Sequence, residues 1–204
     1  MKNVFIATSR DAGRRCSQWA ERNTPRGFKL TENKESAHIV ISVMYDTIFT
    51  QEFLESRQCY NFHPGVLPAY KGVGIFSWVL MNEEEKAGVT LHKIDAGVDT
   101  GEVIEIREFL ISEEDTAYSL FLRGEDLIFK MFKDWYCDIL EQNYIATPQR
   151  SNPGKAYSKK DLQKAKNLTK YAKAFYFPNK ENAFYFNSNA EKVYIAYKES
   201  ESGK

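Results

Sequence analysis

The first 65 residues alternate short apolar runs with amphipathic stretches. Three continuous apolar runs predict strands at residues 4–7, 38–43 and 59–62. Two stretches between them have helical spacing, residues 14–22 and 49–54, and Thr50 is a suitable N-cap for the second. Strands that are apolar throughout and separated by helices are typical of parallel strands covered on both faces. This part of the chain therefore predicts a small wound α/β sheet.

The middle of the chain predicts a helix, a returning pair of strands and one long helix. Apolar positions in residues 74–85 have the spacing of an amphipathic helix. Residues 89–94 alternate like a half-buried strand, turn at "DAGVDTG" and return as residues 103–109. Near-helical spacing over residues 116–142 predicts one long helix that closes the domain, with Gly124 as a weak point.

The remaining residues predict a linker and a small β segment. A polar stretch with prolines, a glycine and many lysines separates an α/β domain at residues 1–146 from a C-terminal segment, and we place this linker at residues 147–170. Within residues 171–204, "AFYFPNKENAFYFNS" predicts a hairpin with "PNKEN" as its turn, followed by "KVYIAYK" as another strand and a frayed tail.

Composition narrows the classes of function. The 204 residues include 28 basic and 28 acidic side chains, so no net charge attracts the protein to nucleic acid or to an anionic membrane. No apolar stretch approaches the roughly 18 to 20 residues of a membrane span, and the N-terminus predicts a strand rather than a signal peptide. The three cysteines, Cys16, Cys59 and Cys137, are widely spaced, which favours reduced thiols in a cytoplasmic protein.

Three polar residues are candidates for chemistry. Asn61 and His63 lie at the end of a predicted strand, where wound sheets open their ligand crevices. Asp99 follows the strand that carries His92 and could reach them. Each residue alone is more typical of an ordinary turn or loop than of a catalytic site. Together they supply an amide donor, a group that titrates near neutral pH and an orienting carboxylate, which suits acyl transfer through a tetrahedral oxyanion.

The motifs around these residues resemble a known family. "NFHPGVLPAYKG" at residues 61–72, "GVTLH" at 88–92 and "VDTG" at 98–101 are similar to the folate-dependent formyltransferases. That family includes glycinamide ribonucleotide, methionyl-tRNA and sugar-nucleotide formyltransferases. The similarity covers roughly residues 40–106, about a third of the chain, and both halves of the pattern occur in the expected order.

The resemblance implies a Rossmann-like formyltransferase fold that binds 10-formyltetrahydrofolate as co-substrate and needs no metal. It implies that Asn61 donates its amide to the formyl oxygen and that His63 stabilises the oxyanion or moves a proton. It also implies that Asp99 holds His63 and assists proton transfer to the departing folate nitrogen. By the same resemblance, the expected cofactor-binding residues are Tyr45, Thr47, Ile48, Phe49 and Asp95.

The acceptor implied by the resemblance is an amino sugar on a nucleoside diphosphate, of the dTDP-amino-dideoxysugar type. The short C-terminal segment is more similar to the β appendage of the sugar-nucleotide enzymes than to the barrel that binds tRNA, and a homodimer through it is a further expectation. The loop after the first strand lacks the glycine that would ease phosphate binding. The candidate substrate contacts are Ser9, Arg10, Tyr70, Lys71, Trp78 and His92.

Other functions stay open. A formyltetrahydrofolate deformylase would use water in place of the amine, although such enzymes usually carry an additional N-terminal regulatory domain. Formylation of another small amine or ribonucleotide is a further alternative. In relatives the Asn-x-His motif lies later in the chain, so one strand-helix unit is expected to be missing or compressed here, which favours a non-catalytic folate- or nucleotide-binding protein. Dinucleotide oxidoreduction and zinc hydrolysis are disfavoured because neither G-x-G-x-x-G nor H-E-x-x-H is found.

Overall fold

The centre of the molecule is a six-stranded sheet. The computed structural model describes residues 1–149, 154–165, 169–187, 189 and 191–195. The sheet contains β1 (Lys2–Thr8), β2 (Phe28–Leu30), β3 (Ile39–Val43), β4 (Gln58–His63), β6 (Lys86–Lys93) and β7 (Val103–Leu110). Their order is β2-β1-β3-β4-β6-β7, with parallel pairing from β2 to β4 and antiparallel pairing at β4–β6 and β6–β7. The expected α/β class with a mostly parallel sheet is confirmed.

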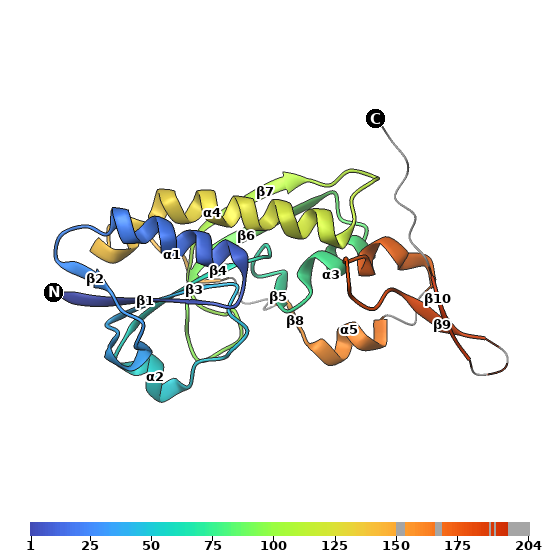
Figure 1. The fold of residues 1–204 in the computed structure, drawn as a ribbon, viewed down its shortest axis with the longest axis horizontal. Coiled ribbons are helices and arrows are strands. Elements are labelled where there is room, and N and C mark those ends of the chain that lie inside the picture. The colour runs from blue at the N-terminus through green and yellow to red at the C-terminus, as the bar shows by residue number, and fades with distance from the viewer. Residues whose placement is uncertain (150–153, 166–168, 188, 190, 196–204) are drawn as a thin grey trace.

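Helices cover both faces of this sheet. The helices are α1 (Asp11–Asn23), α2 (Gln51–Glu55), α3 (Ile75–Met81) and α4 (Ala117–Glu141). Figure 1 shows α1 and α4 side by side on one face and α2 on the other. Buried residues of the sheet, α1 and α4 form one hydrophobic cluster, whereas Phe53 of α2 belongs to a second cluster on the opposite face. The expected cap of α2 is confirmed, because the Thr50 hydroxyl accepts the Phe53 N–H.

The expectation that residues 89–94 form a half-buried strand is wrong. Residues 87–92 of β6 are all buried. One face of β6 contacts α4, while on the other the Thr90 hydroxyl donates to the Gly65 carbonyl and accepts the Leu67 N–H. Alternation in the sequence reflects polar side chains that find partners inside the protein, and not exposure to water.

Gly124 of α4 has a packing role that the periodicity did not indicate. A Cβ atom at this position would lie 2.4 Å from Cζ of Phe76 in α3. The missing side chain therefore lets α3 approach α4 closely, so the glycine predicted as a weak point is required by this helix contact.

One strand of the sheet was not predicted. β2 has only three residues and pairs with β1 at the edge of the sheet. It is followed by a single turn of 3-10 helix, η1 (Lys34–Ser36), and then by β3. The connection from β2 to β3 therefore holds no α-helix.

The C-terminal part differs from the prediction. The predicted linker contains β8 (Lys155–Tyr157), which pairs with β5 (Tyr70–Gly72), and α5 (Lys159–Ala165). Ala174 and Phe175 lie at the end of a 3-10 helix, η2 (Thr169–Phe175), and not in a hairpin arm. They are buried in the cluster that contains α3, and this packing overrides their β propensity.

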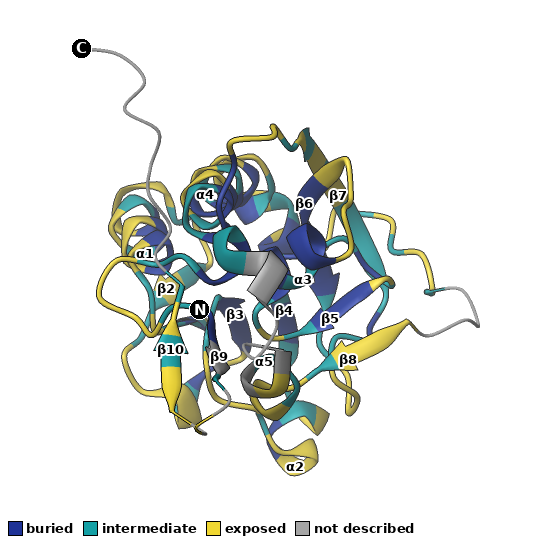
Figure 2. Ribbon diagram, turned by 90° about the vertical axis from the view of Figure 1, so that its right-hand side faces the viewer, coloured by how far each residue is buried: buried dark blue, intermediate teal, exposed yellow. Residues whose placement is uncertain are grey.

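The observed hairpin lies later in the chain. It joins β9 (Phe184–Phe186) to β10 (Lys192–Tyr194) in antiparallel pairing. The predicted end of the last strand and the tail, residues 196–204, lie outside the described residues. Figure 2 shows that the buried residues concentrate in the central sheet and on the inward faces of the helices. The division at residues 146 and 170 stays a prediction.

Candidate functional site

The register of the sheet brings the predicted loops to one edge. Thr8 of β1 pairs with Val43 of β3, which pairs with Phe62 of β4. The loop after β1, the loop after β3 and the end of β4 are therefore neighbours at the carboxyl edge of the parallel strands. This is the edge where wound sheets bind ligands.

The end of β4 presents two polar side chains in the same direction. Successive residues of a strand point to opposite faces, so Asn61 and His63 share a face and Phe62 points away from it. Phe62 is fully buried and packs on Phe132 of α4, with ring centroids 5.4 Å apart. The buried Phe62 thus anchors the strand end, while Asn61 and His63 lie on the other face of β4.

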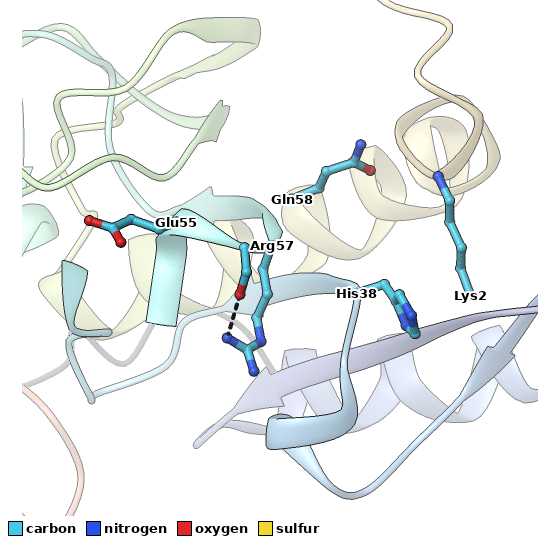
Figure 3. A pocket seen from close by; sticks show the side chains of 6 residues that line it. Lys2, His38, Glu55, Arg57 and Gln58 are labelled. Carbon is cyan, nitrogen blue, oxygen red and sulfur yellow. Dashed lines mark hydrogen bonds between the residues drawn. The ribbon is translucent and has the colours of Figure 1, made fainter. Parts of the chain in front are cut away.

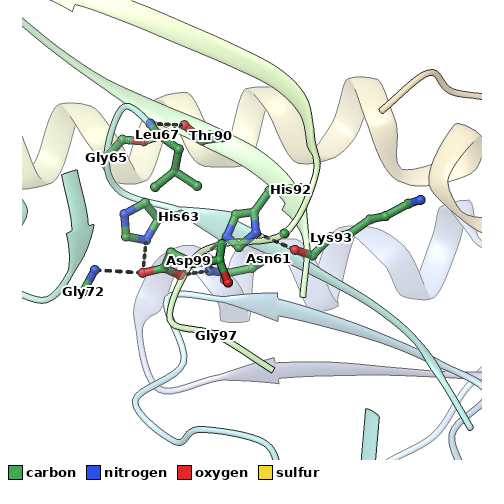
Figure 4. A network of polar contacts seen from close by, with 12 residues as sticks. Asn61, His63, Gly65, Leu67, Gly72, Thr90, His92, Lys93, Gly97 and Asp99 are labelled. Atoms are coloured by element: carbon green, nitrogen blue, oxygen red, sulfur yellow. Dashed lines mark hydrogen bonds and ion pairs between the residues drawn. The ribbon is translucent and has the colours of Figure 1, made fainter. Parts of the chain in front are cut away.

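The loop that carries Asp99 folds back over this pair (Figure 4). Its Oδ1 accepts the Asn61 Nδ2 proton at 3.4 Å, and its Oδ2 lies 3.6 Å from His63 Nδ1. Oδ2 also accepts the Gly72 N–H of β5 at 2.8 Å. The carboxylate therefore lies between the amide and the imidazole. It is near enough to His63 to form an ion pair once the imidazole is protonated, although the separation exceeds that of an ordinary hydrogen bond.

His92 orients the Asn61 amide. The Lys93 carbonyl can only accept, so His92 Nδ1 donates to it at 2.6 Å, and Nε2 is the nitrogen that faces Asn61. Asn61 Nδ2 lies 3.1 Å from that nitrogen. Both Nδ2 protons of Asn61 are thus directed at His92 and Asp99. The opposite amide orientation would place the Asn61 oxygen against the carboxylate, which fixes the assignment.

His63 is buried and tied to the backbone. Its Nε2 donates to the Tyr70 carbonyl at 2.7 Å, which leaves Nδ1 facing Asp99. Burial lowers the pKa of His63 below its ordinary value of 6.5, and Asp99 opposes this effect only in part. Burial raises the pKa of Asp99, but His63, His92 and the Gly72 amide together hold it below its usual range. At neutral pH the site therefore combines a neutral His63 with an ionised Asp99.

The expected cofactor-binding residues lie in two loops. The rings of Tyr45 and Phe49 stack with centroids 5.6 Å apart, and the Ile48 side chain is 82% exposed. Thr47 is also exposed. Asp95 holds its own loop, because its Oδ1 accepts from Gly97 N and from the Thr100 hydroxyl. The structure places the first loop at the site edge, and contact of these residues with a cofactor stays a prediction.

The expected substrate residues of the β1 loop meet the predicted cofactor loop. Arg10 pairs with Asp46 at 3.1 Å, and the Ser9 hydroxyl lies 3.4 Å from the Asp46 N–H. Both partners of the ion pair are well exposed, so it adds little to stability. These contacts join the β1 and β3 loops but direct no anion-binding group at Asn61.

The other expected substrate residues surround β5. The Trp78 ring stacks on Tyr157 with centroids 4.4 Å apart, and the Tyr70 hydroxyl donates to Glu84. Lys71 is only 3% exposed and has no anionic partner among the described residues. His92 is buried behind Asn61, which gives it an orienting role in this geometry. Whether any of these four contacts substrate stays a prediction.

Three contributors were missed by the sequence reasoning. They are the Tyr70 carbonyl, the Gly72 N–H and the Gln149 carboxamide, which contacts the Asp99 loop. Two of them are backbone groups, which any residue type supplies, so composition carried no signal for them. Gln149 lies in the stretch predicted as a linker, where a single polar residue is unremarkable.

A separate hollow of about 370 Å³ lies at the opposite edge of the sheet (Figure 3). Its lining comes from the amino ends of β1, β3 and β4 and from the end of α2: Lys2, His38, Glu55, Ser56, Arg57 and Gln58. The hollow is therefore remote from the cluster at the carboxyl end of β4. Over the described part of the chain, no helix is both long and apolar enough to span a membrane.

Comparisons with known proteins agree with the motifs. A model of the formyl transferase family matches residues 15–134. GDP-perosamine N-formyltransferase from Brucella melitensis is 29% identical over 150 residues, which cover 63% of this chain and 58% of that protein. The chain thus spans less than two thirds of that relative.

Two solved structures show the same fold. A sugar N-formyltransferase from a Shewanella species has a TM-score of 0.87 at 19% identity, over 98% of both chains. The N-formyltransferase from Helicobacter canadensis, solved with folinic acid and dTDP-3-aminofucose, has a TM-score of 0.73 at 22% identity, over 87% of this chain and 81% of that one. These likenesses confirm the expected formyltransferase fold. Since the family model covers more than half of the residues, the chain belongs to the formyl transferase family.

Proposed function

We propose that the protein is an N-formyltransferase that passes the formyl group of 10-formyltetrahydrofolate to the amine of an amino-sugar nucleotide. One observation carries the proposal: an ionised carboxylate lies between the Asn61 amide and the neutral His63 imidazole, within a chain of the formyl transferase family. The folinic acid and dTDP-3-aminofucose of the Helicobacter structure support the two substrate classes.

The reaction requires an oxyanion site and a route for one proton. The amine nitrogen attacks the formyl carbon, and the new C–N bond forms as electrons move onto the formyl oxygen. When this intermediate collapses, the bond to the folate nitrogen breaks and tetrahydrofolate leaves with the proton that the amine has lost. In our proposal, His63 Nδ1 accepts that proton because Nε2 is tied to Tyr70 O. Asp99 stabilises the resulting imidazolium at 3.6 Å and helps return the proton.

Asn61 would stabilise the oxyanion after a small rearrangement. Its two Nδ2 protons point to His92 and Asp99, so donation to the formyl oxygen requires exchange of one partner. The contact to Asp99 is the longer of the two, which makes it the one to exchange. His92 would then keep the amide oriented while the other proton follows the developing charge.

The substrate class is supported by one unpaired cation. Lys71 is 3% exposed and has no anionic partner among the described residues, and its ammonium group is not one of the buried unpaired atoms, so an anionic group of a ligand could pair with it. A diphosphate is such a group, and Lys71 adjoins Gly72, whose N–H holds Asp99. The dTDP type stays part of this proposal, and the GDP-linked sugar of the Brucella relative is its alternative. A homodimer through β9 and β10 likewise stays a prediction.

The proposal is tested by incubating the protein with 10-formyltetrahydrofolate and a panel of dTDP-, GDP- and UDP-linked amino sugars. We expect tetrahydrofolate release that depends on the acceptor. Release at the same rate without acceptor would identify a hydrolase. Folate binding without turnover on any acceptor would identify a binding protein. Either result contradicts the proposal.

Gly65→Ala should lower kcat while the protein stays folded. A Cβ at this position would lie 2.7 Å from both His63 Nε2 and Tyr70 O, so it would separate the two atoms that hold the imidazole. Because small displacements of catalytic groups raise the activation free energy, we expect kcat to fall about 10- to 100-fold. Steady-state kinetics check this, with the melting temperature as the control for folding. Equal kcat in Gly65→Ala and the parent would contradict the proposed role of the contact.

The pH profile should have an acid limb with its midpoint below 6.5. The pKa of His63 is lowered from 6.5, so the base is neutral at pH 7 and becomes protonated only on acidification below that value. Asp99 stays ionised throughout this window because its pKa is held low. kcat/KM as a function of pH checks this, and a limb at or above 6.5 would contradict it. The fold must be monitored in parallel. Because the pKa of His63 is lower in the folded protein than in the unfolded chain, the free energy of unfolding decreases as the pH is lowered below 6.5.

A further inference from the structure

The turn that carries Asp99 has an unfavourable backbone. Asp99 has φ of +51°, in the left-handed region that non-glycine residues rarely adopt. Such conformations cost about 1–3 kcal/mol and persist only where the surroundings fix them. The backbone of Gly101 lies directly against the end of β6, because a Cβ at this position would lie 1.9 Å from the Lys93 carbonyl oxygen. The turn must therefore be held from outside for its carboxylate to stay in place.

Gln149 holds this turn from behind. Its Nε2 donates one proton to the Asp99 carbonyl at 2.9 Å and the other to the Gly101 carbonyl at 2.8 Å. Carbonyl oxygens only accept, so the orientation of the carboxamide is determined. Its Oε1 is buried without a donor among the described residues. Gln149 thus pairs two carbonyls of the turn while one of its own polar atoms stays unpaired, which is unfavourable for the side chain itself.

The segment that carries Gln149 is anchored independently. After α4 the chain returns to the sheet, where Thr147 and Val103 exchange two backbone hydrogen bonds of 2.8 and 2.9 Å. Gln149 thus reaches the turn from a fixed position, about fifty residues away in sequence. On its other side, Asp99 is held through its carboxylate, which accepts from Gly72 N and Asn61 Nδ2 and lies 3.6 Å from His63 Nδ1 and 3.5 Å from His92 Nε2.

We propose that Gln149 is a positioning residue, which keeps the Asp99 carboxylate between Asn61 and His63 by holding the carbonyls of the 99–101 turn. Its effect on catalysis rests on the proposed function, whereas its effect on the turn does not. Gln149→Glu keeps the shape but replaces Nε2, which donates both protons, with a single carboxylate oxygen that faces the two carbonyls. Asn143→Ala is the matched control, because it removes an amide hydrogen bond to Asp138 in the same connection without touching the turn.

The test has an amide readout and a kinetic one. In Gln149→Glu, hydrogen exchange of the Gly72 amide, followed by NMR, should accelerate about tenfold, while the Ile111 amide that bonds to Glu85 is unchanged. kcat should fall about 10- to 100-fold with little change in KM for the folate. Asn143→Ala should change neither.

Two outcomes would overturn the proposal: Gly72 exchange within twofold of the parent in Gln149→Glu, or equal acceleration in Asn143→Ala. A third, unchanged kcat despite faster Gly72 exchange, would overturn the catalytic part. If the parent protein transfers no formyl group to any acceptor, the proposed function fails, and the Gly72 amide still decides whether Gln149 fixes Asp99.

Discussion

Replacing His63 by glutamine should lower kcat for formyl transfer by about 10²- to 10⁴-fold. The glutamine side chain keeps a nitrogen donor, so the Tyr70 carbonyl keeps a hydrogen-bond partner. The amide cannot, however, accept the proton of the amine. The loss should therefore appear in kcat, with the melting temperature close to that of the parent. Stopped-flow or steady-state measurement of tetrahydrofolate formation checks it.

His38→Gln is the matched control for this variant. His38 is exposed and lies at the opposite edge of the sheet, where its Nδ1 accepts the Asn3 N–H. We expect its kcat to equal that of the parent. A His63→Gln protein with more than a tenth of the parental kcat would remove His63 from the proton route.

Asp99→Asn should lower kcat on the order of 10³-fold. Asparagine tolerates the left-handed backbone at this position, and its oxygen can still accept the Gly72 N–H. The variant therefore keeps the turn and removes the negative charge, and it also replaces the acceptor of Asn61 Nδ2 with a donor. Since Asp99 raises the pKa of His63, its loss should also move the acid limb of the pH profile to lower pH.

Asp126→Asn serves as the control for charge removal, because it loses only an exposed ion pair with Arg15. Kinetics over a range of pH measure both effects on the same samples. If Asp99→Asn retains kcat within tenfold of the parent, the carboxylate does not assist proton transfer. If the acid limb does not move, Asp99 does not raise the pKa of His63 as described.

Periodicity predicted the sheet and α4 because burial of apolar surface dominates their stability. Phe62, the single buried residue between Asn61 and His63, was enough to place both side chains on one face of the strand. The hairpin was misplaced because "AFYF" occurs twice with equal β propensity. Packing of Ala174 and Phe175 against α3, which no local pattern encodes, selects the second copy as a strand.

The site was predicted only as far as its side chains have distinctive chemistry. Asn61, His63 and Asp99 were predicted as candidates, and the structure places them together, while their catalytic roles stay predictions. The link from His92 to Asn61 depends on the antiparallel register of β4 and β6, which pairs these two residues directly. The Tyr70 carbonyl and Gly72 N–H carry no residue signature, so only the folded chain shows that they hold the imidazole and the carboxylate.

The most direct measurement follows the formyl carbon itself. The protein is incubated with 10-formyltetrahydrofolate labelled with ¹³C in the formyl group and with the amino-sugar nucleotide that supports turnover, and the label is followed by NMR. We predict that the carbon appears as a formamide on the sugar nitrogen and that this signal is lost in His63→Gln. Label that appears as free formate, with or without the amine, would contradict the account.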